Sequence, residues 1–189
     1  MTKDELRHMF LSRRDDIPAS ERELFSKRIA QRVFGLEEYR TAENVLIYAS
    51  MRSEVITDDI ILDALGCDKK VFCPKVTDPR NGIMKFVHIQ ELSDLKKGYF
   101  GIREPEISED YEEPCFDPGM SLVIMPGVAF DDRRNRIGYS GGFYDRFLAE
   151  NRGLKTLALC FECQMSGSEL PAMAHDVRPD MIITENDVY

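Results

Sequence analysis

Five short apolar runs constrain the fold of this chain more than any other feature of its sequence. Each has four to six residues and no regular alternation with polar residues, which is typical of strands buried on both faces of a sheet. Helical or looped segments separate the runs, so we expect an α/β fold with a mostly parallel sheet flanked by helices. The runs are VLIYA (45–49), KVFCP (70–74), SLVIMP (121–126), TLALCF (156–161) and MIIT (181–184).

Helix signals precede and separate these runs. Thr2 lies three residues before Glu5, the spacing of a capping box, and predicts a helix from about residue 3. Ser20 and Glu23 repeat that spacing and predict a second helix over roughly 20–34. Two further helices are predicted between strands, over 57–66 with Thr57 as its cap and from Phe143 to about Gly153.

Two segments depart from this pattern. DPRNGIMKFVHI (78–89) begins with turn residues and continues as a strand, which we expect to pair antiparallel with 70–76. Residues 96–119 carry three prolines and three glycines and predict a long loop region, a kind of segment that is often functional.

Size and composition predict one soluble domain that spans residues 1–189. Hydrophobic residues at 43% and charged residues at 31% are ordinary values for a globular protein. No apolar run is long enough to span a bilayer, and the N-terminus has no secretory leader. We therefore expect a cytoplasmic monomer with no membrane partner.

The charge balance narrows the class of ligand. Lys plus Arg is 25 against 34 for Asp plus Glu, so the formal net charge is −9 and the pI is about 4.9. An acidic surface repels nucleic acid and anionic membranes over most of its area, so we expect neither to be a partner. An anionic ligand needs a local basic site, and three segments offer one: KDELR (3–7), CPKV with Lys75, and DDRRNR (131–136).

The cysteines do not form a metal or disulfide pattern. Cys160 and Cys163 have C-x-x-C spacing, but Cys160 lies inside the apolar run LALCF and no second pair follows. A redox motif of this type starts a helix after a strand, so we interpret the cysteines as buried reduced thiols. The five are Cys67, Cys73, Cys115, Cys160 and Cys163.

The stretch GYSGGFYDRF (138–147) has two chemical interpretations. The first is a nucleophile elbow of the form G-x-S-x-G, with Ser140 as the attacking group. An elbow needs its serine directly between a strand and a helix, whereas the nearest predicted strand ends near Met125. His175 is the only histidine after the serine, and its neighbouring acid follows it in the chain. Both facts argue against a hydrolase.

The second interpretation is a phosphate-binding loop. Three glycines lead into the helix predicted from Phe143, where backbone N–H groups and the helix dipole stabilise an anion. Arg136 lies just before them and Asp145 lies in the first helical turn, as phosphate and Mg²⁺ would require. The loop is neither a Walker A loop nor a G-x-G-x-x-G fingerprint. Closely spaced glycines are entropically costly unless the backbone needs them, which favours phosphate binding.

MPGVAFDDRRNRIGYSGGFYDRFL (125–148) resembles the signature of the 5-formyltetrahydrofolate cyclo-ligase family, also called methenyltetrahydrofolate synthetases. That signature typically reads P-G-x-A-F-D-x-x-G-x-R-L-G-Y-G-G-G-Y-Y-D-R. The resemblance implies an α/β fold of the type shared with sugar-phosphate isomerases and CoA transferases. Four other segments match the family in the correct order: KDELR (3–7), YASMRSEVIT (48–57), GIREP (101–105) and HDVRPDMIITE (175–185).

The resemblance also implies a reaction. ATP with Mg²⁺ would drive the conversion of 5-formyltetrahydrofolate to 5,10-methenyltetrahydrofolate, with release of ADP and phosphate. Phosphorylation of the formyl oxygen would create a good leaving group, which N10 of the same folate then displaces. No protein nucleophile is needed, so catalysis reduces to positioning and charge stabilisation.

The family implies roles for individual residues. Lys3 and Arg7 would contact the ATP phosphates, and Asp145 and Asp176 would bind Mg²⁺. Glu54 would accept paired N–H bonds from the aminopyrimidinone edge of the folate. Ala49 and Tyr139 would also contact the folate. The nucleotide loop would comprise Arg136, Ile137, Gly138, Tyr139, Ser140, Gly141, Gly142, Phe143 and Tyr144.

Two residues depart from the family signature. Ser140 stands where the family usually has glycine, which suggests that this position does not need a positive φ. Arg134 stands where a glycine commonly makes the turn, and it adds a cation near the phosphates.

Other interpretations stay open on the residues alone. Lys3 and Arg7 are equally typical of solvated helix charges, Asp176 of a turn, and Glu54 of a surface loop. Two other functions are considered: a serine hydrolase that uses Ser140, and a non-catalytic protein that binds nucleotide or folate. A requirement for ATP separates the ligase from the hydrolase, and formation of a product separates both enzymes from the binding protein.

Overall fold

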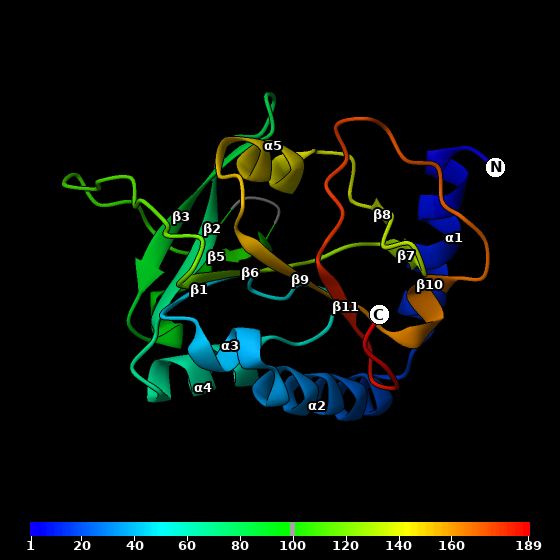
Figure 1. Ribbon diagram of the computed structural model, residues 1–189, viewed down its shortest axis with the longest axis horizontal. Helices are drawn as coiled ribbons and strands as arrows, with labels where there is room; N and C mark the ends of the chain where they lie inside the picture. The colour runs from blue at the N-terminus through cyan, green and yellow to red at the C-terminus, as the bar shows by residue number, and fades with distance from the viewer. Residues whose placement is uncertain (99–100) are drawn as a thin grey trace.

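The fold is centred on a six-stranded sheet, seen in the computed structural model, which describes residues 1–98 and 101–189 (Figure 1). Its strand order is β11-β9-β6-β1-β2-β3, and every neighbouring pair is parallel except the β2–β3 hairpin. The predicted α/β fold with a mostly parallel sheet is confirmed, as is the antiparallel hairpin. The strands are β1 (Asn44–Ile47), β2 (Lys70–Asp78), β3 (Ile83–Ile89), β6 (Ser121–Met125), β9 (Lys155–Leu159) and β11 (Met181–Ile183).

The central strands are apolar because both faces of the sheet are covered. Val45 and Ile47 of β1 point into one core cluster and Leu46 into another, and all three side chains are fully buried. Successive side chains of a strand alternate between faces, so a strand covered on both sides needs a continuous apolar run. This is why all five apolar runs form strands of the sheet.

Helices cover the two faces unequally. On one face lie α2 (Ala19–Gly35), α3 (Glu37–Thr41) and α4 (Asp58–Gly66), and α5 (Phe143–Glu150) lies on the other (Figure 1). Ile29 of α2 and Ile60 of α4 pack in the core cluster on the first face, and Leu148 of α5 packs in the cluster on the other face.

Helix ends follow the predictions only in part. Thr2 and Glu5 form the expected capping box of α1 (Lys3–Asp15). Ser20 is not a cap, because α2 starts one residue earlier and Pro18, with its fixed φ and no N–H, occupies the N-cap position. Thr57 is the N-cap of α4, but its hydroxyl donates to the carbonyl oxygen of Tyr48 instead of capping the helix.

A small second sheet carries α1. It consists of β10 (Met165–Ser166), β7 (Ala129–Asp131) and β8 (Arg136–Ile137), and α1 lies beside it (Figure 1). Phe10 of α1 is 1% exposed and packs in a cluster with Ala129 and Ile137. This docking brings the N-terminus of the chain to the segment that follows β8.

The predicted long loop contains more order than expected. Within it β4 (Lys96–Lys97) pairs antiparallel with β5 (Arg103–Glu104), while residues 99 and 100 lie outside the described part of the chain. Two short 3₁₀ helices, Leu92–Asp94 and Glu162–Gln164, complete the described elements.

Lys75, one of the candidate basic sites, forms an ion pair of 2.6 Å with the buried Glu104, which neutralises its charge.

The cysteine prediction is correct for only part of the set. Cys73 and Cys160 are buried and Cys163 is half-buried, but Cys67 and Cys115 are exposed. All five are free thiols, and burial raises the pKa of Cys163 to about 11. Among the helices in residues 1–98 and 101–189, none is long and apolar enough to cross a membrane.

Candidate active site

The glycine-containing loop 138–142 leads into the N-terminus of a helix, as predicted. Gly142 is the N-cap of α5 and has a φ of +65°, a left-handed conformation that glycine adopts without strain. The N–H of Arg146 donates to its carbonyl oxygen over 3.1 Å. A Cβ atom on Gly141 would lie 2.4 Å from the ring of Phe143, so this position also needs glycine.

Ser140 and Arg134 adopt left-handed backbone conformations although neither is glycine. Their φ angles are +79° and +60°. The expectation that serine marks a position without a positive φ is therefore wrong, and the strain costs about 1–2 kcal/mol per residue. Arg134 Nη1 donates to the carbonyl oxygen of Asp180 over 2.5 Å, which directs this cation toward the chain before β11.

Two basic residues of the first helix, Lys3 and Arg7, fasten it to the loop and to the segment before β11. Arg7 Nε donates to the carbonyl oxygen of Gly138 over 2.7 Å. Lys3 Nζ forms an ion pair of 2.5 Å with Asp176 Oδ2. Lys3 and Arg7 are therefore not merely solvated charges. They join α1 to the loop and to the segment before β11, which are distant in sequence.

Asp145 joins three parts of the chain at the start of α5. Its Oδ1 accepts from Arg136 Nη2 over 2.8 Å and from the N–H of Val177 over 2.9 Å. The second bond brings the backbone that follows Asp176 to the start of α5. Arg136 is 8% exposed, and among the described residues its Nε has no hydrogen-bond partner.

The two carboxylates each keep one oxygen available. Within residues 1–98 and 101–189, neither Asp145 Oδ2 nor Asp176 Oδ1 has a hydrogen-bond partner. Burial acts to raise the pKa of Asp176, but the bonds from Lys3 and from the Met173 N–H outweigh it and leave this pKa below its usual value. Asp176 is thus held as an anion.

The carboxylates of Asp145 and Asp176 fit Mg²⁺ if a substrate supplies further ligands. The described residues contain no cluster of three or more His, Cys, Asp or Glu side chains that could hold a metal alone. Mg²⁺ is usually bound by one or two carboxylates together with substrate phosphates. Asp145 and Asp176 could therefore hold the ion jointly with a nucleotide.

Glu54 is a buried acid and not a residue of a surface loop. It follows β1, and only 5% of its surface is exposed. Tyr139 Oη donates to Glu54 Oε1 over 2.6 Å, and the N–H of Met51 donates to Oε2 over 2.9 Å. The structure thus brings together two of the three predicted folate contacts. The third, Ala49, is 4% exposed and belongs to a core cluster.

Sequence reasoning missed Arg14. This residue of α1 is 2% exposed and donates to Tyr139 Oη over 2.6 Å and to Ser53 Oγ over 2.9 Å. Arg14 follows Phe10 by four residues and so shares the buried face of the helix. A basic residue on the buried face of a predicted helix was the sequence signal that could have identified Arg14.

The arrangement around Ser140 does not suit a nucleophile. Ser140 is exposed, and within the described residues its hydroxyl has no hydrogen-bond partner that could act as a base. The side chain of His175 is 76% exposed and lies 3.9 Å from Asp176.

Tyr144, beside the loop, is buried, and burial raises its pKa. Its hydroxyl has no partner among the described residues.

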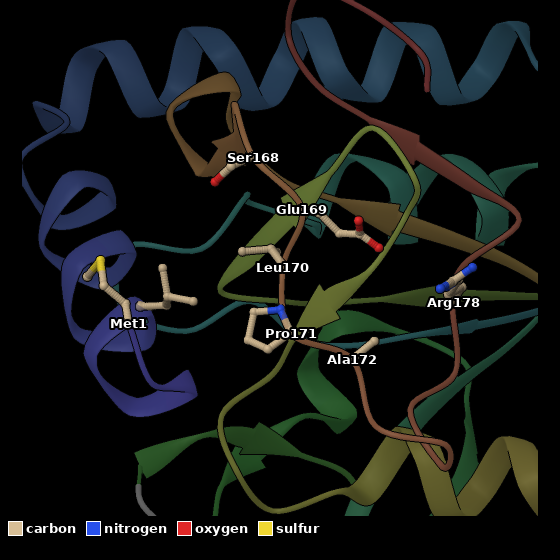
Figure 2. Close-up of a pocket in the computed structure, with 8 residues that line it drawn as sticks. Met1, Ser168, Glu169, Leu170, Pro171, Ala172 and Arg178 are labelled. Atoms are coloured by element: carbon tan, nitrogen blue, oxygen red, sulfur yellow. The ribbon is translucent and has the colours of Figure 1, made fainter.

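A cavity of about 750 Å³ opens between the start of α1 and the segment 168–178. Figure 2 shows Met1 on one side, Arg178 on the other, and the chain from Ser168 to Ala172 between them. Arg178 is exposed and adds a cation that the sequence did not single out. The lining residues are Met1, Leu6, Ser168, Glu169, Leu170, Pro171, Ala172 and Arg178.

Known proteins resemble this chain along most of its length. The mouse (Mus musculus) 5-formyltetrahydrofolate cyclo-ligase is 29% identical, with 90% of this chain and 87% of that protein covered. The Haemophilus influenzae protein of the same name is 28% identical, with 87% of each chain covered. The Escherichia coli K12 protein is 25% identical, covering 96% of this chain and 99% of that one.

Solved structures agree with the sequence comparison. The Aquifex aeolicus 5,10-methenyltetrahydrofolate synthetase is 28% identical and superimposes with a TM-score of 0.82 over 100% of this chain and 92% of that chain. The Mycoplasma pneumoniae 5,10-methenyltetrahydrofolate synthetase, at 21% identity, shares the fold with a TM-score of 0.74, covering 98% and 99%. The 5-formyltetrahydrofolate cyclo-ligase family matches residues 1–185, and this chain belongs to that family.

Proposed function

We propose that this protein converts 5-formyltetrahydrofolate to 5,10-methenyltetrahydrofolate with consumption of ATP and release of ADP and phosphate. The observation that carries the proposal is the convergence of two sets of residues on loop 138–142. Arg7 bonds the loop, Lys3 pairs with Asp176, and Asp145 lies in the first turn of the helix after the loop. Tyr139 links the loop to the buried Glu54. Family membership supports the same conclusion.

The phosphates of ATP would lie on the loop, at the N-terminus of α5. Backbone N–H groups and the helix dipole stabilise anions there. Lys3 and Arg7 supply cations that would exchange their present partners for phosphate oxygens, and Arg136 contributes a buried charge beside Asp145. The nucleotide loop would comprise Arg136, Ile137, Gly138, Tyr139, Ser140, Gly141, Gly142, Phe143 and Tyr144.

The cavity beside α1 is a suitable place for the rest of the nucleotide. Met1 and Leu6 of its lining flank Lys3 in the chain, and it combines the apolar side chains of Leu6 and Leu170 with the cation of Arg178. Asp145 and Asp176 would hold Mg²⁺, which neutralises charge on the transferring phosphoryl group when bound. The chain's own part is to hold Asp176 as an anion through Lys3 and the Met173 N–H, and to position Asp145 through Arg136 and the Val177 N–H.

The folate would lie with its aminopyrimidinone edge against Glu54. A carboxylate can accept two parallel N–H bonds, and Tyr139 and Met51 orient this one. Ala49 contributes an apolar wall at the end of β1. Phosphate and folate sites then meet at Tyr139, which belongs to the loop and contacts Glu54.

The chemistry needs no protein nucleophile. The formyl oxygen attacks the γ-phosphorus and ADP leaves with the electrons of the broken P–O bond. N10 of the folate then attacks the activated formyl carbon, phosphate leaves, and N10 loses its proton. The residues described here orient the reactants and stabilise the developing charge.

We further propose that the enzyme is a cytoplasmic monomer that binds neither nucleic acid nor membranes. Its net charge of −9 supports the absence of nucleic-acid and membrane binding, since both surfaces are polyanions.

The test is direct. Protein, MgATP and 5-formyltetrahydrofolate are mixed, and the methenyl product is followed by its near-ultraviolet absorbance. We expect product only when ATP is present, and none with an analogue whose β,γ-bridge is an imido group. Formyl hydrolysis without ATP would favour the hydrolase instead. Binding of both ligands without any product would favour the non-catalytic binding protein.

A further inference from the structure

Arg14 is a buried cation whose side chain contacts hydroxyl groups. It is 2% exposed, and within residues 1–98 and 101–189 no salt bridge joins it to a carboxylate. Its two side-chain hydrogen bonds go to Tyr139 Oη at 2.6 Å and Ser53 Oγ at 2.9 Å. Burying a guanidinium is costly unless its charge stabilises something nearby.

The hydrogen-bond directions around Tyr139 are determined by Arg14. A guanidinium can only donate, so the phenolic oxygen accepts from Arg14 and its single proton points to Glu54 Oε1, 2.6 Å away. The N–H of Met51 donates to Oε2 over 2.9 Å. Both oxygens of Glu54 therefore receive a donor, which matches the carboxylate and not the protonated acid.

A second hydrogen bond from Arg14 holds the turn that contains Glu54. Ser53 Oγ accepts from Arg14 Nε and donates to the carboxylate of Asp15. Ser53 immediately precedes Glu54, so Arg14 fixes the chain at one residue and the side chain at the next. Both bonds join this turn to α1, which is far from it in sequence.

We propose that Arg14 is a positioning residue that acts through Tyr139 and Ser53 to hold Glu54 as an oriented carboxylate for the folate. This rests on the proposed function, because it assigns the folate edge to Glu54. Burial raises the pKa of Glu54, whereas the bonds from Tyr139 and Met51 and the charges of Arg14 and Arg52 lower it. Loss of Arg14 therefore moves this pKa further upward.

The other groups that face Glu54 do not titrate near neutral pH. The tyrosines have raised pKa values, with burial as the main cause, so they stay neutral. The arginines stay charged. A titration in this range thus belongs to Glu54. The surrounding groups are Arg14 on α1, Tyr48 after β1, Arg52 in the same turn, Tyr139 in the loop and Tyr144 on α5.

The first experiment measures Glu54 directly. The carboxyl ¹³C resonance of Glu54 is titrated by NMR in wild type, Arg14→Met and Arg14→Lys, with Glu54→Gln to assign the signal. We expect a higher pKa in Arg14→Met and a value near wild type in Arg14→Lys, which keeps the charge. The matched control is Arg13→Met, which removes an exposed cation of the same helix. Equal Glu54 titrations in folded wild type and Arg14→Met would overturn the proposal.

The second experiment separates positioning from folding. A Glu54 whose pKa is raised loses its carboxylate as the pH falls, so the folate KM of Arg14→Met should exceed the wild-type value by at least about tenfold at pH 6 and approach it as the pH rises. The ATP KM should change little. Tyr139→Phe should give a similar folate defect, and the double variant should be less than additive.

A structural role would have a different signature. A loosened α1 would raise the ATP KM as well, since Lys3 and Arg7 lie on the same helix, and the defect would not depend on pH. That result would contradict the proposal. If wild-type protein forms no methenyl product, the proposed function fails, yet the NMR titration still decides whether Arg14 controls Glu54.

Discussion

Ser140 holds a backbone conformation that glycine adopts more easily. Its φ is +79°, and its hydroxyl has no hydrogen-bond partner among the described residues. We predict that Ser140→Gly raises the free energy of unfolding by about 1 kcal/mol or less, because relief of strain is partly offset by a more flexible unfolded chain. Ser140→Ala should reduce kcat/KM by about tenfold or less. Chemical denaturation and the ATP-dependent assay measure the two effects.

A serine nucleophile would respond very differently. Its loss typically costs on the order of 10⁶ in kcat, as in the subtilisin example from which this magnitude comes. Collapse of activity in Ser140→Ala, together with covalent labelling of wild-type Ser140 by a fluorophosphonate, would refute the ligase mechanism.

Single residues were predictable where a motif carries them and not where partners lie far apart in sequence. Glu54 and Tyr139 could be chosen as folate contacts from their motifs, but no pattern shows that residues 85 positions apart share a hydrogen bond. Arg14 was missed although its spacing from Phe10 places it on the buried face of α1, because its partners Ser53 and Tyr139 lie far from it in sequence. The strain at Ser140 was also missed, since composition does not report φ.

At the scale of elements, the start of α5 depends on Asp145. Its Oδ1 binds both Arg136 of β8 and the backbone before β11, while Oδ2 is available for a metal. We predict that Asp145→Asn lowers the free energy of unfolding by about 1.5–3 kcal/mol, the worth of a charged hydrogen bond. It should also raise the Mg²⁺ concentration needed for half-maximal turnover by tenfold or more.

The control is Glu150→Gln, which removes an exposed carboxylate from the other end of the same helix. A metal requirement that is unchanged in Asp145→Asn, despite a lowered unfolding free energy, would assign Asp145 to structure alone.

Elements were predictable in proportion to the apolar surface that each one buries. The five central strands are continuous apolar runs and the long helices carry a helical period, and all were found. Strands β7, β8 and β10 have two or three residues each, which is too short for any periodicity to register. The cap of α2 was misplaced because Pro18 and Ser20 both favour a helix start. The site residues come from α1, α5 and connecting loops, with Arg136 on β8, and their contacts join segments distant in sequence, which is why the geometry of the site needed the structure.

At the scale of the whole molecule, the site is complete only when α1 is docked. Three site residues, Lys3, Arg7 and Arg14, reach their partners from this one helix. Its main apolar anchor is Phe10, which is 1% exposed and packs against the small sheet and not the six-stranded sheet. We therefore expect docking of α1 and stability of the central sheet to be separable.

We predict that Phe10→Ala selectively undocks α1. Truncating a buried phenylalanine costs about 3–5 kcal/mol, enough to populate the undocked state. The apparent KM for ATP and for folate should both rise, because affinity falls with the fraction of binding-competent protein, while kcat at saturation stays near wild type. Hydrogen exchange should show faster exchange in α1 and unchanged protection in β1, β6 and β9.

Ligand binding should reverse the defect. Saturating MgATP engages Lys3 and Arg7 and should restore protection to the α1 amides of Phe10→Ala. Phe34→Ala is the matched control, since Phe34 of α2 packs on the main core and its loss should weaken the sheet without selective exposure of α1. If Phe10→Ala loosened α1 and the central sheet together, or raised the ATP KM with α1 fully protected, docking of α1 would not be the step that assembles the site.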